Sequence, residues 1–335
     1  MAMAHHAWWS HLEEDDNVIG SLGNVLVTSI SRKVPLVQCV KRAMGALQGT
    51  SRLIGGDADG NALARYFTDD FWQMPILSEA GVAYLISECE ARGIRAIIPT
   101  RDGELSYFAE HKSVFSAAGI EVMVSPPAAV QICLDKLRFA TVGSELGFLV
   151  IPTSTDLNTE LDTRWVVKER FGAGSHGLGI DFTEDAAQSF SASLIEPIFQ
   201  PYLQGTEYSI DVYVDRAGRA KGAVARTRDL VRDGESQITT TCRHTALEET
   251  CKSFAQALGV YGHAVFQAIV DANGQLHLIE CNARFGGAST ASVAAGLTSF
   301  TWFLREAAGE MLDAYPFVRT ERELTQVRAP MDVIF

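Results

Sequence analysis

The first third of the chain alternates short apolar runs with amphipathic stretches. Apolar runs of strand length occur at residues 24–29, 51–57, 93–100 and 119–125, and stretches with helical spacing of apolar residues separate them at 34–47, 77–92 and 105–118. Strands that alternate with helices of this length indicate βαβ units and a parallel sheet. We therefore expect residues 24–127 to form an α/β domain that ends at Pro126-Pro127.

A different pattern begins after residue 127. Residues 128–147 and 247–258 have helical spacing, whereas 165–180, 207–226 and 263–282 each have the pattern of two strands around a turn. Strand pairs joined by short turns are antiparallel. The second part of the chain is therefore expected to be an α+β domain, unlike the first.

The hairpin expected at residues 263–282 brings polar side chains together. Asn273-Gly274 is the preferred pair for a two-residue type I′ turn, and that turn places Gln267 directly opposite Glu280. Opposed side chains share a face, with Cβ atoms about 5 Å apart, and Asn282 continues this face beyond Glu280. One carboxylate and two amide oxygens suit Mg²⁺, which proteins typically bind together with substrate phosphates.

Arg284 continues the same face and can stabilise the charge of a transferring phosphate group. The alternative is a partly exposed polar strand face without a ligand. Apolar neighbours such as Val265 and Leu278 favour a buried strand, in which an uncompensated glutamate is costly. These residues therefore favour a metal site.

A second signal is the glycine-rich segment KERFGAGSHGLG at residues 168–179. Glycines let backbone N–H groups approach and surround phosphate oxygens, and Lys168 on the entering strand can reach a phosphate. The segment is neither a Walker A loop nor a dinucleotide-binding fingerprint, because it lacks Gly-Lys-Ser/Thr and no helix pattern follows it. A mobile turn without a ligand is the alternative.

Two weaker signals follow. Residues 200–203 can form a linking segment with an apolar wall, and Glu207 can accept hydrogen bonds from ribose hydroxyls, although a solvated glutamate is commoner. Arg226 and Arg228 share a strand face and, with Arg232, can grip a carboxylate or phosphate. Salt bridges to acidic residues of the chain are the alternative for these arginines.

Composition narrows the class of protein. Of 335 residues, 47% are apolar and 21% are charged, which excludes collagen, coiled coil and wholesale disorder. The net charge of −13 disfavours binding to nucleic acid or to an anionic membrane. Six scattered cysteines argue against disulfides and structural zinc, and with no signal peptide or apolar span they indicate a cytoplasmic protein. Residues 1–23 are expected to be a disordered tail.

Taken in order, these motifs resemble the ATP-grasp superfamily, in particular its carbamoyl-phosphate-synthase-like branch. The matching segments are DK at 135–136, VVKERFGAGSHGLG at 166–179, QPYLQGTEYSIDVYVD at 200–215 and GHAVFQAIVDANGQLHLIECNARFGG at 262–287. The resemblance implies a pre-ATP-grasp α/β domain at 24–127 and an ATP-grasp domain at 128–312. In the latter, a small subdomain (128–200) and a large subdomain (201–312) would clasp ATP, and 313–335 would be a C-terminal extension.

The resemblance also implies a role for each candidate residue. Arg284 and Lys168 match the catalytic cations. The residues that match ATP contacts are Lys136, Lys168, the flap residues Gly172, Gly174, Ser175, His176 and Gly177, the adenine-contacting Gln200, Tyr202 and Leu203, and the ribose ligand Glu207. The family usually has glutamate where Gln200 stands. Gln267, Glu280 and Asn282 match ligands of Mg²⁺ or Mn²⁺, and Arg226, Arg228 and Arg232 are substrate candidates.

The implied reaction is an ATP-dependent ligation. A substrate carboxylate would take the γ-phosphoryl group of Mg-ATP, and an amine would displace phosphate from the acyl phosphate. Two alternatives remain, namely an acyl- or carboxy-phosphate-forming enzyme with a non-amine acceptor and a non-catalytic ATP-binding sensor. The expected partners are small-molecule carboxylate and amine substrates, with neither nucleic acid nor membrane, and family habit makes a homodimer plausible.

Overall fold

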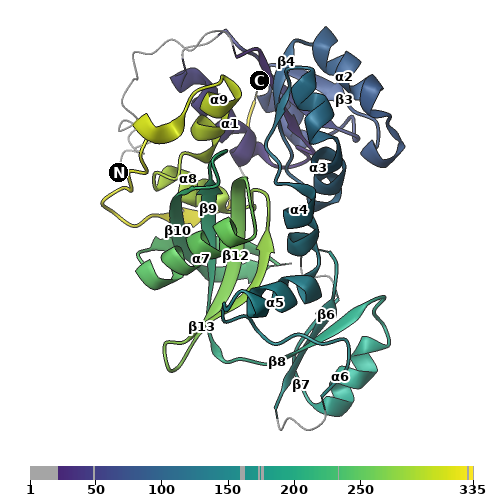
Figure 1. Ribbon diagram of the computed structural model, residues 1–335, viewed down its shortest axis with the longest axis vertical. Coiled ribbons are helices and arrows are strands. Elements are labelled where there is room, and N and C mark those ends of the chain that lie inside the picture. The colour runs from purple at the N-terminus through teal and green to yellow at the C-terminus, as the bar shows by residue number, and fades with distance from the viewer. Residues whose placement is uncertain are drawn as a thin grey trace. The chain divides into compact units, whose positions relative to one another are not determined.

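The computed structural model describes residues 22–47, 50–158, 163–172, 174, 177–232, 234–329 and 332–334 (Figure 1). The chain divides into two compact units, residues 1–100, 111–123 and 298–318 in the first and residues 101–110, 124–297 and 319–335 in the second. The expected tail falls outside the described residues except for residues 22 and 23. The domain boundaries at 24, 128 and 313 and the subdomain limit at 200 stay predictions.

The first unit contains a five-stranded parallel sheet in the order β3-β2-β1-β4-β5. Its strands are β1 Asn24–Thr28, β2 Leu53–Asp57, β3 Asp70–Gln73, β4 Ile94–Ile98 and β5 Glu121–Val122. Its helices are α1 Val34–Ala46, η1 Leu63–Phe67, η2 Leu77–Glu79, α2 Val82–Ala91, α9 Ser299–Ala307, η3 Leu312–Ala314 and the later part of α3 Asp102–Ala117. The parallel sheet that the sequence predicts is confirmed.

The apolar strand runs form the core of this unit. Val25, Leu26 and Val27 of β1 are fully buried, as expected for a central parallel strand. Helix α1 begins with Pro35 in its first turn, where the missing N–H group costs nothing. Strand β3 was not predicted, because DFWQ carries too short a pattern to identify a strand. Helix α9, far away in the sequence, packs against α1.

The second unit contains two antiparallel sheets, which confirms the expected α+β class. The larger has the order β13-β12-β9-β10-β11-β14, and the smaller β7-β6-β8. The large-sheet strands are β9 Gly205–Val214, β10 Ala220–Arg232, β11 Glu235–Cys242, β12 Gly262–Asp271, β13 Leu276–Asn282 and β14 Thr325–Val327. The small-sheet strands are β6 Trp165–Glu169, β7 Leu178–Phe182 and β8 Pro197–Pro201.

Helices pack against both sheets of this unit. They are α4 Pro127–Leu134, α5 Lys136–Glu145, α6 Glu184–Ser191, α7 Thr245–Ala257, α8 Ser289–Ala294 and the start of α3. Helix α7 lies against β9 and β10 (Figure 1). The rings of Phe139, Phe254 and Phe266 are fully buried and 5.2–6.5 Å apart, so α5, α7 and β12 share one core. Within the described residues, no helix has both the length and the apolar character needed to cross a membrane.

The turn between β12 and β13 differs from the prediction. The backbone N–H of Asp271 donates to the carbonyl of Gln275, so the strands join through a loop of residues 272–274. Gly274 takes a positive φ of 79° in this loop. The predicted two-residue type I′ turn at Asn273-Gly274 is therefore wrong, because the loop contains one more residue.

Gln267 nevertheless lies opposite Glu280, as predicted. The register shifts between the pair Gln267–Glu280 and the next pair, Ala268–Leu278, so Ile279 forms a bulge in β13. The extra residue of the bulge offsets the extra residue of the loop. The predicted face is thus formed through a local geometry that the sequence pattern does not contain.

Candidate active site

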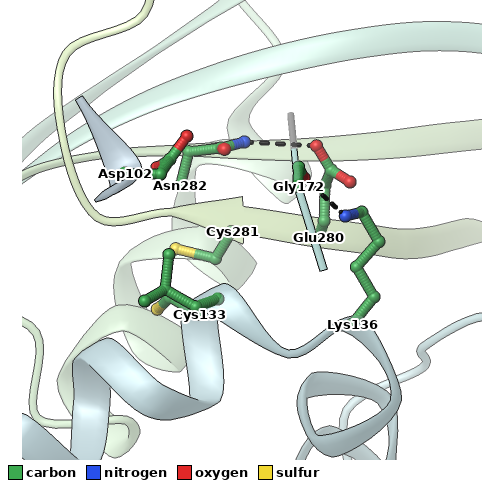
Figure 2. A pocket seen from close by; sticks show the side chains of 8 residues that line it. Asp102, Cys133, Lys136, Gly172, Glu280, Cys281 and Asn282 are labelled. Carbon is green, nitrogen blue, oxygen red and sulfur yellow. Dashed lines mark hydrogen bonds between the residues drawn. The ribbon is translucent and has the colours of Figure 1, made fainter. Parts of the chain in front are cut away.

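The second unit contains a pocket beside the last three residues of strand β13. It is lined by Asp102, Cys133, Leu134, Lys136, Gly172, Glu280, Cys281 and Asn282. Figure 2 shows the Asn282 amide donating a hydrogen bond of 3.2 Å to the Glu280 carboxylate. The structure thereby brings two of the three predicted metal ligands into one pocket, and the third, Gln267, lies across the strands from Glu280.

Lys168 supplies positive charge to this pocket. It lies on β6, is 8% exposed and interacts electrostatically with Glu280, Lys136 and Glu207. Burial lowers the pKa of Lys168, and the carboxylates of Glu280 and Glu207 only partly offset this effect. For Glu280, burial acts to raise the pKa, but the charges of Lys168, Lys136 and Arg284 and the hydrogen bond from Asn282 together outweigh it and hold the pKa below its usual range. Glu280 therefore remains an anion at neutral pH.

Lys136 is the first residue of α5, and its Nζ donates to the Gly172 carbonyl at 2.7 Å (Figure 2). The preceding Asp135 caps α5, because its carboxylate accepts the N–H groups of Leu137 and Arg138. Asp135 also accepts a bidentate pair of hydrogen bonds from Arg170, at 2.8 and 2.6 Å. The Asp135–Arg170 pair, which sequence reasoning missed, ties the strand end that carries the glycine-rich loop to the helix that carries Lys136.

The glycine-rich loop connects β6 and β7. Gly172 and Gly177 have φ values of 102° and 65°, in the left-handed region where a Cβ atom is strained, so glycine is required at both. Gly174 also lies in this loop and is exposed. The predicted flap residues Ser175 and His176 fall outside the described residues.

The predicted adenine-contacting residues lie at the end of β8. Gln200 belongs to the strand and is 2% exposed, and its Nε2 donates to the hydroxyl of Thr153 at 2.8 Å. Tyr202 and Leu203 follow the strand and are half-buried. The Tyr202 N–H donates to the carbonyl of Arg164, which fixes the path of the backbone.

Glu207, the predicted ribose ligand, lies on β9 and pairs with Arg228 at 2.8 Å. Burial raises the pKa of Glu207, and the neighbouring charge of Arg228 lowers it in part. The second terminal nitrogen of Arg228 donates to the carbonyl of Gly234. Arg228 therefore links the predicted ribose ligand to the β10–β11 turn.

Arg226 lies deeper in the second unit. It is 3% exposed, and its Nε donates to the fully buried Asp211 at 2.7 Å. Asp211 also accepts from Ser289 and Ser292 and lies 3.0 Å from the Nε2 of His263. Arg232 occupies the end of β10 and is exposed. The three substrate candidates thus differ in setting, and all three lie on β10.

Arg284 follows β13 and is held by a carboxylate that sequence reasoning did not connect with it. Asp102, the first residue of α3, accepts two hydrogen bonds from the Arg284 guanidinium, one of them 2.8 Å long from Nε. The same guanidinium donates to the Asn282 side chain at 3.2 Å. Arg284 is therefore fixed beside the predicted metal ligands.

Cys281 lies between Glu280 and Asn282 on β13 and also lines the pocket. Its side chain is 1% exposed and faces the thiol of Cys133 on α4 (Figure 2). Burial raises the pKa of the Cys281 thiol well above its usual range. A thiol without thiolate character is a poor nucleophile, so Cys281 is suited to packing and not to nucleophilic catalysis.

The donor set of this site fits a hard cation bound together with phosphate. It has one carboxylate and two amides, and the described residues contain no group of three or more His, Cys, Asp or Glu side chains placed to hold a metal by themselves. Mg²⁺ suits such a set, because it is commonly held by one or two carboxylates and by substrate phosphates. Lys136 and Lys168 place positive charge close enough to Glu280 to lower its pKa.

Comparisons with known proteins give matches to two family models. A family model described as "ATP-grasp in the biosynthetic pathway with Ter operon" matches residues 194–330, and one described as "PylC-like, N-terminal domain" matches residues 25–123. A comparison with curated protein sequences finds no match.

Solved structures share the fold over most of the chain. A biotin carboxylase from Campylobacter jejuni, in complex with β-γ-ATP, has a TM-score of 0.72 at 18% identity over 90% of this chain and 75% of that one. N5-carboxyaminoimidazole synthetase from Staphylococcus aureus, complexed with ADP, has a TM-score of 0.66 at 17% identity over 88% and 80%. An L-amino acid ligase from Bacillus licheniformis has a TM-score of 0.64 at 15% identity over 85% of this chain and 74% of that one. At these identities the structures establish the fold.

Strands β6 and β7 of the small sheet lie between the two family matches, whereas β8 lies inside the second, and the order of the matches agrees with the order of motifs in the sequence. The parallel sheet of the first unit and the paired antiparallel sheets of the second complete the agreement. The ATP-grasp match at residues 194–330 and the PylC-like match ahead of it at residues 25–123, together with the shared fold, support the ATP-grasp superfamily with a PylC-like domain before its ATP-grasp part.

Proposed function

We propose that this protein is an ATP-dependent ligase that activates a substrate carboxylate as an acyl phosphate and joins it to an amine. ATP with Mg²⁺ is the cofactor that ATP-grasp enzymes use. The observation that carries the proposal is the pocket in which Glu280 and Asn282 lie beside Lys136, with Arg284 fixed next to them. A polar face of this kind matches the charge of a nucleotide triphosphate.

In this proposal the nucleotide lies between the glycine-rich loop and the large sheet. Lys136 and Lys168 neutralise phosphate charge, and the loop at 172–177 covers the phosphates. Gln200, Tyr202 and Leu203 contact the adenine, and Glu207 accepts hydrogen bonds from the ribose. The lowered pKa of Lys168 does not conflict with this role, because a bound polyphosphate adds negative charge that favours the protonated amine.

Gln267, Glu280 and Asn282 would hold the metal ion. When bound, Mg²⁺ supplies charge neutralisation and a template for the phosphate oxygens. The protein's own part is to keep Glu280 anionic through the charges of Lys168 and Lys136. Two amides and one carboxylate give the metal a weakly anionic site.

The proposed reaction has two steps. The substrate carboxylate oxygen attacks the γ-phosphorus and ADP leaves, and the amine nitrogen then attacks the acyl carbon and phosphate leaves. Phosphoryl transfer mainly requires positioning and stabilisation of charge, which Lys168 and Arg284 provide. The glycine-rich loop excludes water, which would otherwise hydrolyse the acyl phosphate. No nucleophilic serine or cysteine is required.

The arginines of β10 would border the acceptor side of the site. Arg232 is exposed and is our candidate for direct contact with a substrate carboxylate or phosphate. Arg226 and Arg228 already bind Asp211 and Glu207, so a substrate would have to exchange with these carboxylates. We therefore propose that Arg226 and Arg228 act mainly by shaping strand β10 through these ion pairs.

The test measures ADP formation with a panel of carboxylates, each with and without an amine. A carboxylate–amine pair that raises ADP formation and gives an amide supports ligation. ADP formed with a carboxylate alone, with transfer to a non-amine acceptor, favours the second function class. ATP binding without turnover for every pair would instead identify a sensor.

Glu280→Ala and Arg284→Ala are expected to abolish turnover while the fold persists, because they remove the metal carboxylate and the cation at the transferring phosphate. Glu145→Ala at the end of α5 is the matched control, since this glutamate is exposed and outside the pocket. Far-ultraviolet circular dichroism checks the fold. Turnover retained in either site variant would contradict the assignment.

A further inference from the structure

The side-chain amide of Gln200 can face a ligand with either its oxygen or its NH₂ group. The ATP-grasp sequences that this chain resembles usually have a glutamate here, and a carboxylate accepts hydrogen bonds at both oxygens. An amide accepts at one end and donates at the other, so its recognition of a base depends on which end faces the ligand. A chain with glutamine therefore needs a neighbour that fixes the orientation.

Thr153 is such a neighbour. Its hydroxyl donates to the carbonyl of Ile151 at 2.9 Å, and the hydroxyl oxygen accepts from Nε2 of Gln200 at 2.8 Å. A hydroxyl has one proton, so while it is donated to Ile151 the oxygen can only accept. If the amide were reversed, the hydroxyl would have to donate its proton to Oε1 of Gln200. The hydrogen bond to the carbonyl of Ile151 would then be lost. The network thus holds Nε2 on Thr153 and turns Oε1 away from it.

The strand register places this amide on the face that carries Lys168. In the small sheet Val166 lies opposite Gln200 and Lys168 lies opposite Ile198, so the four side chains share one face. The other face packs under α6 through Trp165, Val167 and Phe199. Gln200 therefore lies on the same side of the sheet as the buried lysine that interacts with Glu280.

We propose that Thr153 is a positioning residue that sets the purine preference of the nucleotide site, by holding the Gln200 amide with its oxygen as the acceptor for a 6-amino group. This rests on the proposed function, which places adenine beside Gln200. A purine with an amine at position 6 donates to that oxygen. A purine with a carbonyl at position 6 places two acceptors against each other and is disfavoured.

The test measures dissociation constants of Mg²⁺ complexes of ATP, ITP and purine riboside triphosphate, which carry an amine, a carbonyl and only hydrogen at position 6. Thr153→Val keeps the shape of the side chain but removes the hydroxyl, so the amide can rotate. We expect the ATP/ITP affinity ratio to fall about tenfold, which corresponds to one hydrogen bond. The affinity for purine riboside triphosphate should change little.

Two further variants separate orientation from structure. Thr153→Ser keeps the hydroxyl and should keep the ratio. Gln200→Glu accepts at both oxygens, so adding Thr153→Val in that background should leave the ratio unchanged. A ratio that Thr153→Val does not alter, although ATP binds tightly, overturns this inference and leaves the proposed function standing. Wild-type protein that binds none of the three nucleotides overturns both.

Discussion

Replacement of Asp211 by asparagine removes the negative charge from the centre of a buried cluster. Asp211 is fully buried on β9 and accepts hydrogen bonds from Arg226 and Ser292, each 2.7 Å long, and from Ser289. His263 lies 3.0 Å away. The asparagine has the same shape but leaves the guanidinium of Arg226, which is 3% exposed, without a counter-charge.

The magnitude follows from this burial. Removing one partner of a buried ion pair costs about 3–5 kcal/mol, because the other charge stays in a medium of low dielectric constant. For a unit of this size, 1 kcal/mol lowers the melting temperature by about 2–4 °C, so we expect a fall of roughly 6–20 °C. Differential scanning calorimetry and urea unfolding measure the two quantities.

Asp215→Asn is the matched control. Asp215 is 2% exposed and follows the same strand, but its partner Arg219 is 52% exposed and keeps its hydration when the charge is lost. This change should cost at most about 1 kcal/mol. An unfolding free energy of Asp211→Asn within 1 kcal/mol of the wild-type value would refute the argument that the cluster is held by its central charge.

The same cluster makes the protein sensitive to acid. Burial acts to raise the pKa of Asp211, but the charge of Arg226 and the hydrogen bonds with His263 and Ser289 together outweigh it and hold that pKa well below its usual range. Burial lowers the pKa of His263, so the folded state keeps this imidazole neutral. Below about pH 6.5 the unfolded chain binds a proton at His263 that the folded chain does not, and below about pH 4 the same holds for Asp211. We therefore expect the melting temperature to fall as the pH falls below 6.5, and a constant value down to pH 4 would contradict it.

Two further predictions concern the site and the sheet. Asp102→Asn weakens the bidentate contact that fixes Arg284, so turnover should fall by about tenfold or more while the dissociation constant of ATP stays nearly constant, and an unchanged kcat would remove Asp102 from the site. Gly205→Ala places a Cβ atom 2.3 Å from the carbonyl oxygen of Val270 and should destabilise the sheet by more than about 1 kcal/mol in urea unfolding. Gly45→Ala is its control, because this exposed helical position has open space around the new Cβ, and it should stabilise by about 0.5–1 kcal/mol. Equal effects of the two alanines would show that the clash is relieved at little cost.

The pairing of Gln267 with Glu280 shows how much a local sequence pattern can predict. The sequence predicts that Gln267 and Glu280 are opposed, and the structure agrees. The predicted reason was wrong, because the loop is longer by one residue and the bulge at Ile279 compensates. Alternation along a strand indicates which side chains share a buried face. Burial of that face constrains how the strands pair, whatever the length of the turn between them.

The sequence alone therefore determined the two kinds of sheet, the resemblance to ATP-grasp proteins, and the segments that carry the candidate site. These depend on periodicity and on motifs, which are properties of neighbouring residues. Tertiary structure decided the partners of the charged side chains. Asp102 meets Arg284 and His263 meets Asp211 across long stretches of chain. Such pairs arise when packing brings distant strands and helices together, and no local pattern encodes which carboxylate a guanidinium will reach.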